Sequence, residues 1–314
     1  MPKSKLTIIK FGGNAMQSST SFNQSTINWH QPDIKIDTSA IAEYAAEQTD
    51  IESFQSDGAV LLKQVFADWV EPLRAGLQRN LDQPQNYAFP CESNPDGEPG
   101  RFFDSYCNWQ LIPEYLDYLT HSCAASIAGQ FMRSQSAQFF HDHAFMKAAG
   151  TQRATPWHQD LPYYCVDGTQ SASVYVALDQ ADPDVAVQFV KGSHRWQQLY
   201  YPRVFEDGSN FNDGGESSMC AVPDIDAQPD QYDLTRFALE PGDGIVFDFR
   251  TLHGTSNAPV KSTRRAFSSR WLGDDSHYCE RPGETSPNYR NHGMQNGDRM
   301  REDWFPVLWR SKGD

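Results

Sequence analysis

Two side chains that commonly bind metal ions, His158 and Asp160, lie two positions apart in the stretch TPWHQDLPYY, residues 155–164. On an extended strand, side chains two apart point the same way, so both can reach one ion. An imidazole and a carboxylate supply two of the three ligands of the facial triad that holds non-haem Fe(II). The pair therefore predicts a metal site with a third, distant ligand. The alternative is a polar turn or a hydrogen-bonded histidine without metal.

The third ligand is best supplied by His253, one of nine histidines in the chain. It follows PGDGIVFDF, in which a turn and an apolar run predict a strand that ends just before it. The adjacent Gly254 permits close backbone approach. Arg264 opens the predicted strand RRAFSSRW eleven residues later. Its planar guanidinium suits the distal carboxylate of a dicarboxylate that chelates the metal.

Other histidines compete less well for the metal. His141 and His143 form a second closely spaced pair, but we expect packing or hydrogen bonding there rather than ligation. His194, in the turn GSHRW, either approaches the site or closes a hairpin.

These residues resemble the phytanoyl-CoA dioxygenase-like family of Fe(II)/2-oxoglutarate-dependent oxygenases. The resemblance extends over FQSDGAVLLKQVF, PWHQDLPYY, FVKGSHRW, PGDGIVFDFRTLHGTSNA and RRAFSSRWLGDD, within residues 53–275. It implies Fe(II) bound by the catalytic residues His158, Asp160 and His253, with 2-oxoglutarate as co-substrate and O₂ as oxidant. It implies that Arg264 and Thr255 bind the co-substrate, with Tyr175 and Lys147 close to it.

The resemblance also implies a reaction. Asp160 is retained, whereas halogenating members of the family lack this carboxylate, so a hydroxylase is implied. Such an enzyme hydroxylates an unactivated C–H of a small organic metabolite while 2-oxoglutarate is decarboxylated to succinate and CO₂. Two other interpretations are a cupin-type metalloenzyme that does not use 2-oxoglutarate and a non-catalytic β-barrel binding protein. Arg264 argues against the cupin-type metalloenzyme, and the complete set of three ligands argues against the binding protein.

Candidate substrate residues surround the ligands. Trp157, Tyr163 and Tyr164 either line a substrate pocket or fill the core. Alternation along RRAFSSRW places Arg270 on the same face as Arg264. A buried arginine needs an anionic partner. That partner is a substrate carboxylate or phosphate, or else a structural carboxylate such as Asp274 or Asp248, while Lys147 could equally be a solvated strand-edge lysine.

Secondary-structure patterns predict the scaffold. Helices are expected within residues 38–58, 67–81 and 111–133, and a short strand at 58–66. Strands bounded by turns are expected within 137–148, 171–181, 185–192, 235–249 and 264–275, with a long loop at 202–234. We expect a mostly β fold with flanking α-helices and a double-stranded β-helix (jelly-roll, cupin-like) core. A single domain 1–314 would comprise an irregular arm to about 40, helices mainly at 40–135, the β-core at about 137–275 and a tail at 276–314.

Composition restricts the partners. The chain has 41 acidic and 26 basic residues and a formal net charge of −15, which argues against nucleic acid and anionic membranes. No apolar run approaches the roughly 18 residues of a membrane span. Six scattered cysteines without a CxxC pair favour free thiols in a reducing cytoplasm. We expect a cytoplasmic monomer or homodimer acting on a small molecule, with no nucleic acid and no membrane partner.

Overall fold

The structure is a computed structural model that describes residues 36–92, 97–205, 208–210 and 219–312. Most of the predicted N-terminal arm and parts of the predicted 202–234 loop lie outside these residues. In the described part of that loop, a 3₁₀ turn precedes a short strand.

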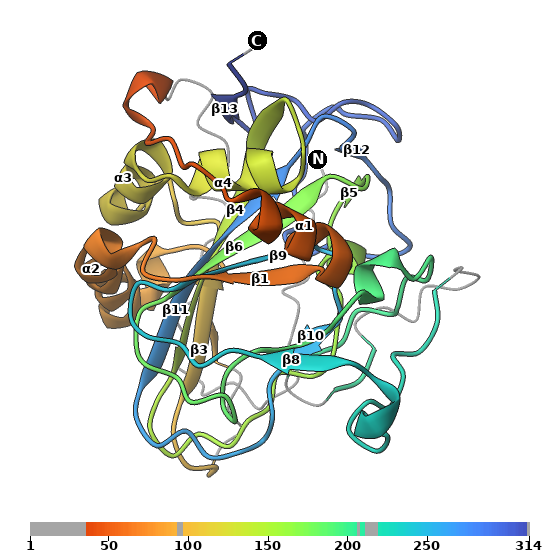
Figure 1. The fold of residues 1–314 in the computed structure, drawn as a ribbon. Helices are drawn as coiled ribbons and strands as arrows, with labels where there is room; N and C mark the ends of the chain where they lie inside the picture. Colours follow the sequence, from red (N-terminus) through yellow and green to blue (C-terminus); the bar gives the residue numbers. More distant parts are fainter. Residues whose placement is uncertain (1–35, 93–96, 206–207, 211–218, 313–314) are drawn as a thin grey trace, which may run out of the picture.

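Two antiparallel sheets form the core (Figure 1). The larger, eight-stranded sheet has the order β1-β9-β6-β11-β4-β3-β2, with β13 beside β4. Its strands are β1 (Ala59–Leu62), β2 (Cys91–Glu92), β3 (Phe102–Tyr106), β4 (Ser136–Lys147), β6 (Ser171–Ala177), β9 (Gly244–Phe247), β11 (Arg264–Leu272) and β13 (Val307–Arg310). The smaller sheet contains β10 (His253–Gly254), β7 (Gln188–Val190) and β8 (Leu234–Arg236), and a separate pair joins β5 (Val166–Asp167) to β12 (His277–Tyr278).

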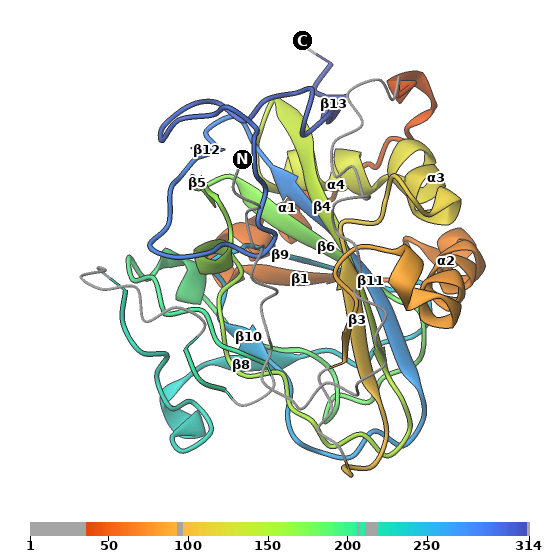
Figure 2. The same ribbon diagram turned by 180° about the vertical axis from the view of Figure 1, so that it is seen from behind.

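Helices cover the face of the large sheet that turns away from the small sheet (Figures 1 and 2). They are α1 (Gln48–Asp57), α2 (Val70–Asp82), α3 (Pro113–His121) and α4 (Ala124–Phe131). Short 3₁₀ turns are η2 (Thr38–Ala40), η3 (Ala67–Trp69), η4 (Pro84–Asn86), η5 (Leu161–Tyr163), η6 (Ser193–Arg195) and η7 (Pro229–Gln231). The expected mostly β, jelly-roll class is confirmed, although the two sheets do not close into a barrel.

Strand alternation divides the side chains of β11 between two cores. Phe267 and Trp271 pack with the helices in the main hydrophobic cluster, whereas Ala266 packs between the sheets. Because successive side chains on a strand point to opposite faces, Arg264 and Arg270 also face the space between the sheets. Both arginines are buried there, so the scaffold requires them to find polar partners.

The helical prediction for residues 38–58 is only partly correct. Helix α1 begins at Gln48 and ends at Asp57, and the C-cap Gly58 that follows has a positive φ of 82°, which suits glycine. Upstream, the chain lies irregularly against α4, where the Tyr44 and Ala46 amides donate to the side chains of Ser126 and Gln130. These tertiary hydrogen bonds replace the helical ones that the apolar spacing predicted.

A strand was also missed inside the predicted helical third. Residues 102–106 form β3, which pairs with β4 over five residue pairs and thereby adds a wall to the space between the sheets. The tail beyond residue 275 likewise contributes strands, because β13 pairs with β4.

Candidate metal centre and co-substrate pocket

The two histidines of the predicted triad are bonded to each other through their backbones. His158 N donates to His253 O, and His253 N donates to His158 O, both at 2.9 Å. Gly254 makes this approach possible, because a Cβ there would lie 3.0 Å from Thr155 O and 3.2 Å from Trp157 N. The fold itself therefore brings together two ligand segments that are far apart in sequence.

Asp160 reaches the same point by a turn, not along an extended strand as its spacing suggested. Its backbone is in the right-handed helical region and it precedes the turn η5, which has Pro162 in its first positions. Proline is pre-organised for such a helical start. The correction is local, since the carboxylate still converges with both imidazoles.

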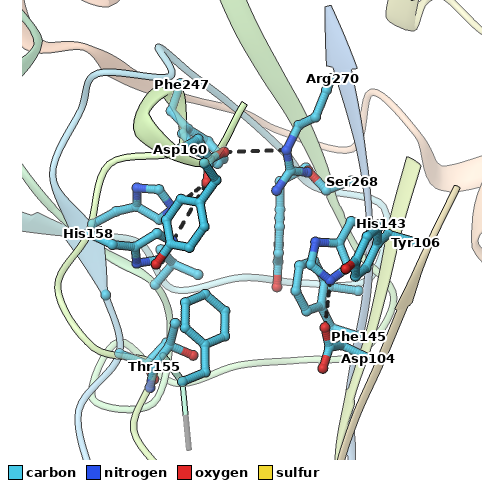
Figure 3. Close-up of a pocket in the computed structure, with 18 of the residues that line it drawn as sticks. Asp104, Tyr106, His143, Phe145, Thr155, His158, Asp160, Phe247, Ser268 and Arg270 are labelled. Atoms are coloured by element: carbon cyan, nitrogen blue, oxygen red, sulfur yellow. Dashed lines mark hydrogen bonds and ion pairs between the residues drawn. The ribbon is translucent and has the colours of Figure 1, made fainter. Parts of the chain in front are cut away.

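The three side chains present their ligand atoms to one place (Figure 3). Asp160 Oδ1 lies 3.6 Å from Nε2 of His158 and 3.6 Å from Nε2 of His253. Each imidazole donates its Nδ1–H to a backbone carbonyl, His158 to Pro156 O at 2.7 Å and His253 to Thr251 O at 2.9 Å. That bond fixes the tautomer and leaves Nε2 free for a metal.

The electrostatics suit a divalent cation. Burial, and then the His158 imidazole, lower the pKa of His253 to about 3, so its ring is neutral. Burial alone raises the pKa of the Asp160 carboxyl, but Arg270 and His158 outweigh it and hold that pKa below its usual value. Two imidazole nitrogens and one ionised carboxylate, all buried, match the donor set of non-haem iron sites.

The anionic partner of Arg270 is Asp160, and neither Asp274 nor Asp248 takes that role. Its Nε lies 3.3 Å from Asp160 Oδ2 and 3.1 Å from the Tyr164 hydroxyl. Ser173 Oγ donates to the same carboxylate oxygen at 3.1 Å. Oδ2 is therefore held by the protein, and Oδ1 is turned to the imidazoles.

A second buried arginine, Arg264, lines the same cavity. Arg264 Nη2 donates to the Tyr175 hydroxyl at 3.2 Å, and its Nη1 donates to Val185 O. Lys147 lies opposite Arg264 in the β4–β11 register, and its Nζ donates to Thr255 Oγ1 at 3.1 Å. Burial, and then Arg264, lower the pKa of Lys147. The four residues whose roles were implied for the co-substrate thus adjoin one another in the cavity lining.

The aromatic residues beside the ligands separate into two groups. Tyr163 and Tyr164 line the cavity. Trp157 points elsewhere: it packs on the cluster around Leu252 and donates Nε1–H to Asp226 at 2.9 Å. Its predicted substrate contact is therefore not supported.

Several cavity residues were not assigned a substrate role from the sequence. Asp104 bonds His143 at 2.8 Å, and both line the cavity with His141, Ser268, Tyr106 and Phe145. The sequence signal for Asp104 was strand alternation within RFFDSY, which places Phe102, Asp104 and Tyr106 on one face of β3. His194 instead bonds Gln55 O and does not contribute to the lining.

Comparison with solved structures shows which known proteins share this fold. The carbocyclase SnoK of nogalamycin biosynthesis, described as non-haem and α-ketoglutarate-dependent, superposes with a TM-score of 0.61 and 18% identity over 83% of this chain and 96% of its own. The epimerase SnoN, in complex with Fe³⁺, α-ketoglutarate and nogalamycin RO, gives 0.63 and 18% over 83% and 98%. EctD from S. alaskensis, with 2-oxoglutarate and 5-hydroxyectoine, gives 0.58 and 16% over 85% and 91%.

The family follows from the sequence. Residues 54–266 match the family model described as phytanoyl-CoA dioxygenase (PhyH), and the chain belongs to this family. It is an Fe(II)/2-oxoglutarate-dependent oxygenase-family enzyme, with Fe(II), 2-oxoglutarate and O₂ as its cofactors and co-substrates. No protein of curated function matches the sequence. Within the described residues, no helix has the length and apolarity needed to cross a membrane.

Proposed function

We propose that this enzyme hydroxylates an unactivated C–H of a small organic metabolite while converting 2-oxoglutarate to succinate and CO₂. The observation that carries the proposal is the convergence of His158 and His253 with a retained carboxylate, Asp160, in one buried cluster. With three protein ligands, positions remain on the metal for a chelating co-substrate and O₂. The Arg264 guanidinium in the same cavity supports a dicarboxylate as that chelator.

The residues around the co-substrate have separate binding roles. When bound to the triad, iron with 2-oxoglutarate would supply the activation of O₂ that oxidises the substrate. Arg264 binds the distal carboxylate of 2-oxoglutarate, and the Lys147 amino group supplies a hydrogen-bond donor at the same end. Tyr175 and Thr255 hold these two side chains in place through the hydrogen bonds described above. The aromatic lining keeps water away from the reacting groups.

The neighbours support a small-molecule substrate and bear on the outcome of the reaction. SnoN and EctD were crystallised with nogalamycin RO and with 5-hydroxyectoine. Because SnoN is an epimerase and SnoK a carbocyclase, the same fold supports outcomes other than hydroxylation. The identity of the product therefore has to be part of any test.

The first test is an anaerobic titration with Fe(II) and 2-oxoglutarate, followed by the weak visible absorption of the chelate. We expect a saturable band in the wild type, no band in His158→Ala, and a normal band in His277→Ala. His277 is a matched control because it lies outside the cavity lining. A missing wild-type band, or one that survives His158→Ala, would contradict the proposed metal centre.

The second test adds O₂ and a metabolite library. We expect one substrate to couple succinate formation to a product heavier by one oxygen atom, as measured by mass spectrometry. A coupled product of unchanged mass, or one lighter by two hydrogens, would refute hydroxylation while leaving the oxygenase class intact.

A further inference from the structure

Two paired strands, β4 and β11, build a cavity wall that reaches the metal ligands at Arg270, the ion-pair partner of Asp160. In their register His143 lies beside Ser268, and His141 lies beside Arg270. Figure 3 shows His143 and Ser268 across the cavity from His158. All four side chains line the cavity, and the triad and the co-substrate pocket leave most of their polar atoms unused.

Three buried polar atoms on this wall have no hydrogen-bond partner among the described residues: His141 Nε2, Ser268 Oγ and Arg270 Nη1. Their side chains belong to residues that are 1–4% exposed. Buried polar groups without partners are rare and destabilise the fold unless a ligand or ordered water binds them. Three of them on neighbouring strands, inside a binding cavity, indicate a polar ligand at this wall.

The donor and acceptor roles of these atoms restrict that ligand. Arg270 Nη1 can only donate. His141 Nδ1 bonds Asp142 O at 3.1 Å; since a carbonyl only accepts, Nδ1 carries the hydrogen. Burial, and then Arg270, lower the pKa of His141, so the ring is neutral and Nε2 is an acceptor. The ligand must therefore accept from Arg270 and donate to His141.

His143 adds a second acceptor to the wall. Its Nε2 bonds Asp104 Oδ2 at 2.8 Å, which places the hydrogen on Nε2 beside the carboxylate and leaves Nδ1 with a lone pair. Burial lowers the pKa of His143 and keeps the ring neutral. Phe145 and Tyr106 flank the ring, with centroids 3.9 and 5.1 Å away, so its orientation is fixed.

We propose that His141, His143, Ser268 and Arg270 form a hydroxyl subsite, which binds neighbouring hydroxyl groups on an apolar ring or chain of the substrate. A hydroxyl both accepts and donates, so it satisfies arginine and histidine together. A carboxylate satisfies Arg270 but turns oxygen lone pairs towards both imidazole acceptors. The subsite therefore disfavours the substrate carboxylate or phosphate that Arg270 alone would suit.

The rest of the cavity suits an apolar body attached to those hydroxyls. Its lining includes several aromatic rings: Phe102, Tyr106, Phe145, Phe189 and Phe247. Ring faces and edges of this kind bury apolar ligand surface, while a few placed polar groups fix its orientation. This inference rests on the proposed function, because it assigns the substrate of that same site.

Calorimetric titration tests the subsite with two matched probes, cis-1,2-cyclohexanediol and cyclohexanecarboxylate. The full chain is titrated metal-free and again with Fe(II) and 2-oxoglutarate under nitrogen. We expect the diol to bind in both states, and to bind more tightly than the carboxylate once 2-oxoglutarate occupies the pocket at Arg264. Ser268→Ala and His141→Phe should each weaken diol binding roughly tenfold, the usual worth of one hydrogen bond.

Ser269→Ala is the matched control on the same strand. Ser269 faces the other side of the sheet, where its hydroxyl accepts from Trp271 Nε1 at 2.8 Å. Its loss should lower the melting temperature and leave diol binding unchanged. Ser268→Ala should do the reverse, because Ser268 Oγ has no partner in the described structure.

Three results would overturn the subsite. The first is equal or tighter binding of the carboxylate in the presence of Fe(II) and 2-oxoglutarate. The second is no binding of the diol up to its solubility limit, which would mean that water alone binds the wall. The third is diol binding that Ser268→Ala does not weaken. The metal-free titration separates this inference from the proposed function. Diol binding by a chain that never forms the iron–2-oxoglutarate band would refute the proposed function alone. A normal band in a chain that does not bind the diol would refute the subsite alone.

Discussion

Replacing Arg264 by methionine tests the co-substrate site most directly. The guanidinium is already held by Val185 O and the Tyr175 hydroxyl, so its remaining N–H groups are pre-oriented for a bound carboxylate. Hydrogen bonds to charged groups contribute about 1.5–3 kcal/mol each. Two such bonds would contribute about 3–6 kcal/mol, and the Lys147 amino group on the facing strand can still donate a hydrogen bond to the carboxylate. We therefore expect a loss of about 2–4 kcal/mol, which is a roughly 30- to 1000-fold weaker affinity for 2-oxoglutarate.

The assay is the 2-oxoglutarate dependence of the visible chelate band at saturating Fe(II), with metal affinity measured separately. Arg265→Met is the matched control, since Arg265 neighbours Arg264 but points to the opposite face and pairs with Asp179 at 2.8 Å. The control should lose some stability and keep its co-substrate affinity. An Arg264→Met variant that binds 2-oxoglutarate within about threefold of wild type, a difference below 1 kcal/mol, would remove Arg264 from its assigned role.

Three further predictions concern charge and packing. Arg270→Met removes the cation beside Asp160, so the pKa of the Asp160 carboxyl should rise and protons should compete with the metal for it. The affinity for Co(II) should therefore fall at least about tenfold, and the loss should be larger at pH 6 than at pH 8. An equal affinity at the two pH values would contradict this prediction. Burial raises the pKa of Asp248 to about 7, so the folded chain retains a proton that the unfolded chain loses, and wild-type stability declines as pH rises to that value. Urea unfolding should therefore show Asp248→Asn gaining about 2 kcal/mol on wild type between pH 5.5 and 8.5, and a constant difference would refute the shift. Gly254→Ala places a Cβ 3.0 Å from Thr155 O; it should cost about 1–3 kcal/mol of stability and weaken metal binding, and unchanged metal affinity would show that the strands can separate freely.

Local patterns predicted the parts of this fold that depend on local physics. The apolar spacing of residues 67–81 and 111–133 became α2, α3 and α4, and alternation along β11 correctly separated cavity-facing from helix-facing side chains. Ligand spacing also predicted which three side chains converge. The helices and the alternation along β11 follow from side-chain periodicity, whereas the ligands converge through a turn at Asp160 and the backbone pairing of His158 with His253.

Features that depend on distant partners could not be predicted in this way. Asp104 becomes a cavity residue only because β3 pairs with β4. Trp157 adjoins a ligand in sequence, yet its indole bonds Asp226 across a loop. Arg270 required a buried anion, but only the folded chain shows that this anion is a member of the triad itself. In each case the deciding contact joins segments whose pairing no local pattern encodes.

The reciprocal backbone hydrogen bonds between His158 and His253 bear on how the protein acquires its metal. Because folding already gathers these ligands, an ion is not needed to nucleate the structure, in contrast to domains that fold only around zinc. A ready-made cage of two imidazoles and a carboxylate binds Ni²⁺, Cu²⁺ or Zn²⁺ more strongly than Fe²⁺ by the usual affinity order. The metal that this site binds thus depends on which ions the cell supplies. The metal found in a purified sample therefore reports the ions of the growth medium and does not by itself identify the metal that the reaction needs.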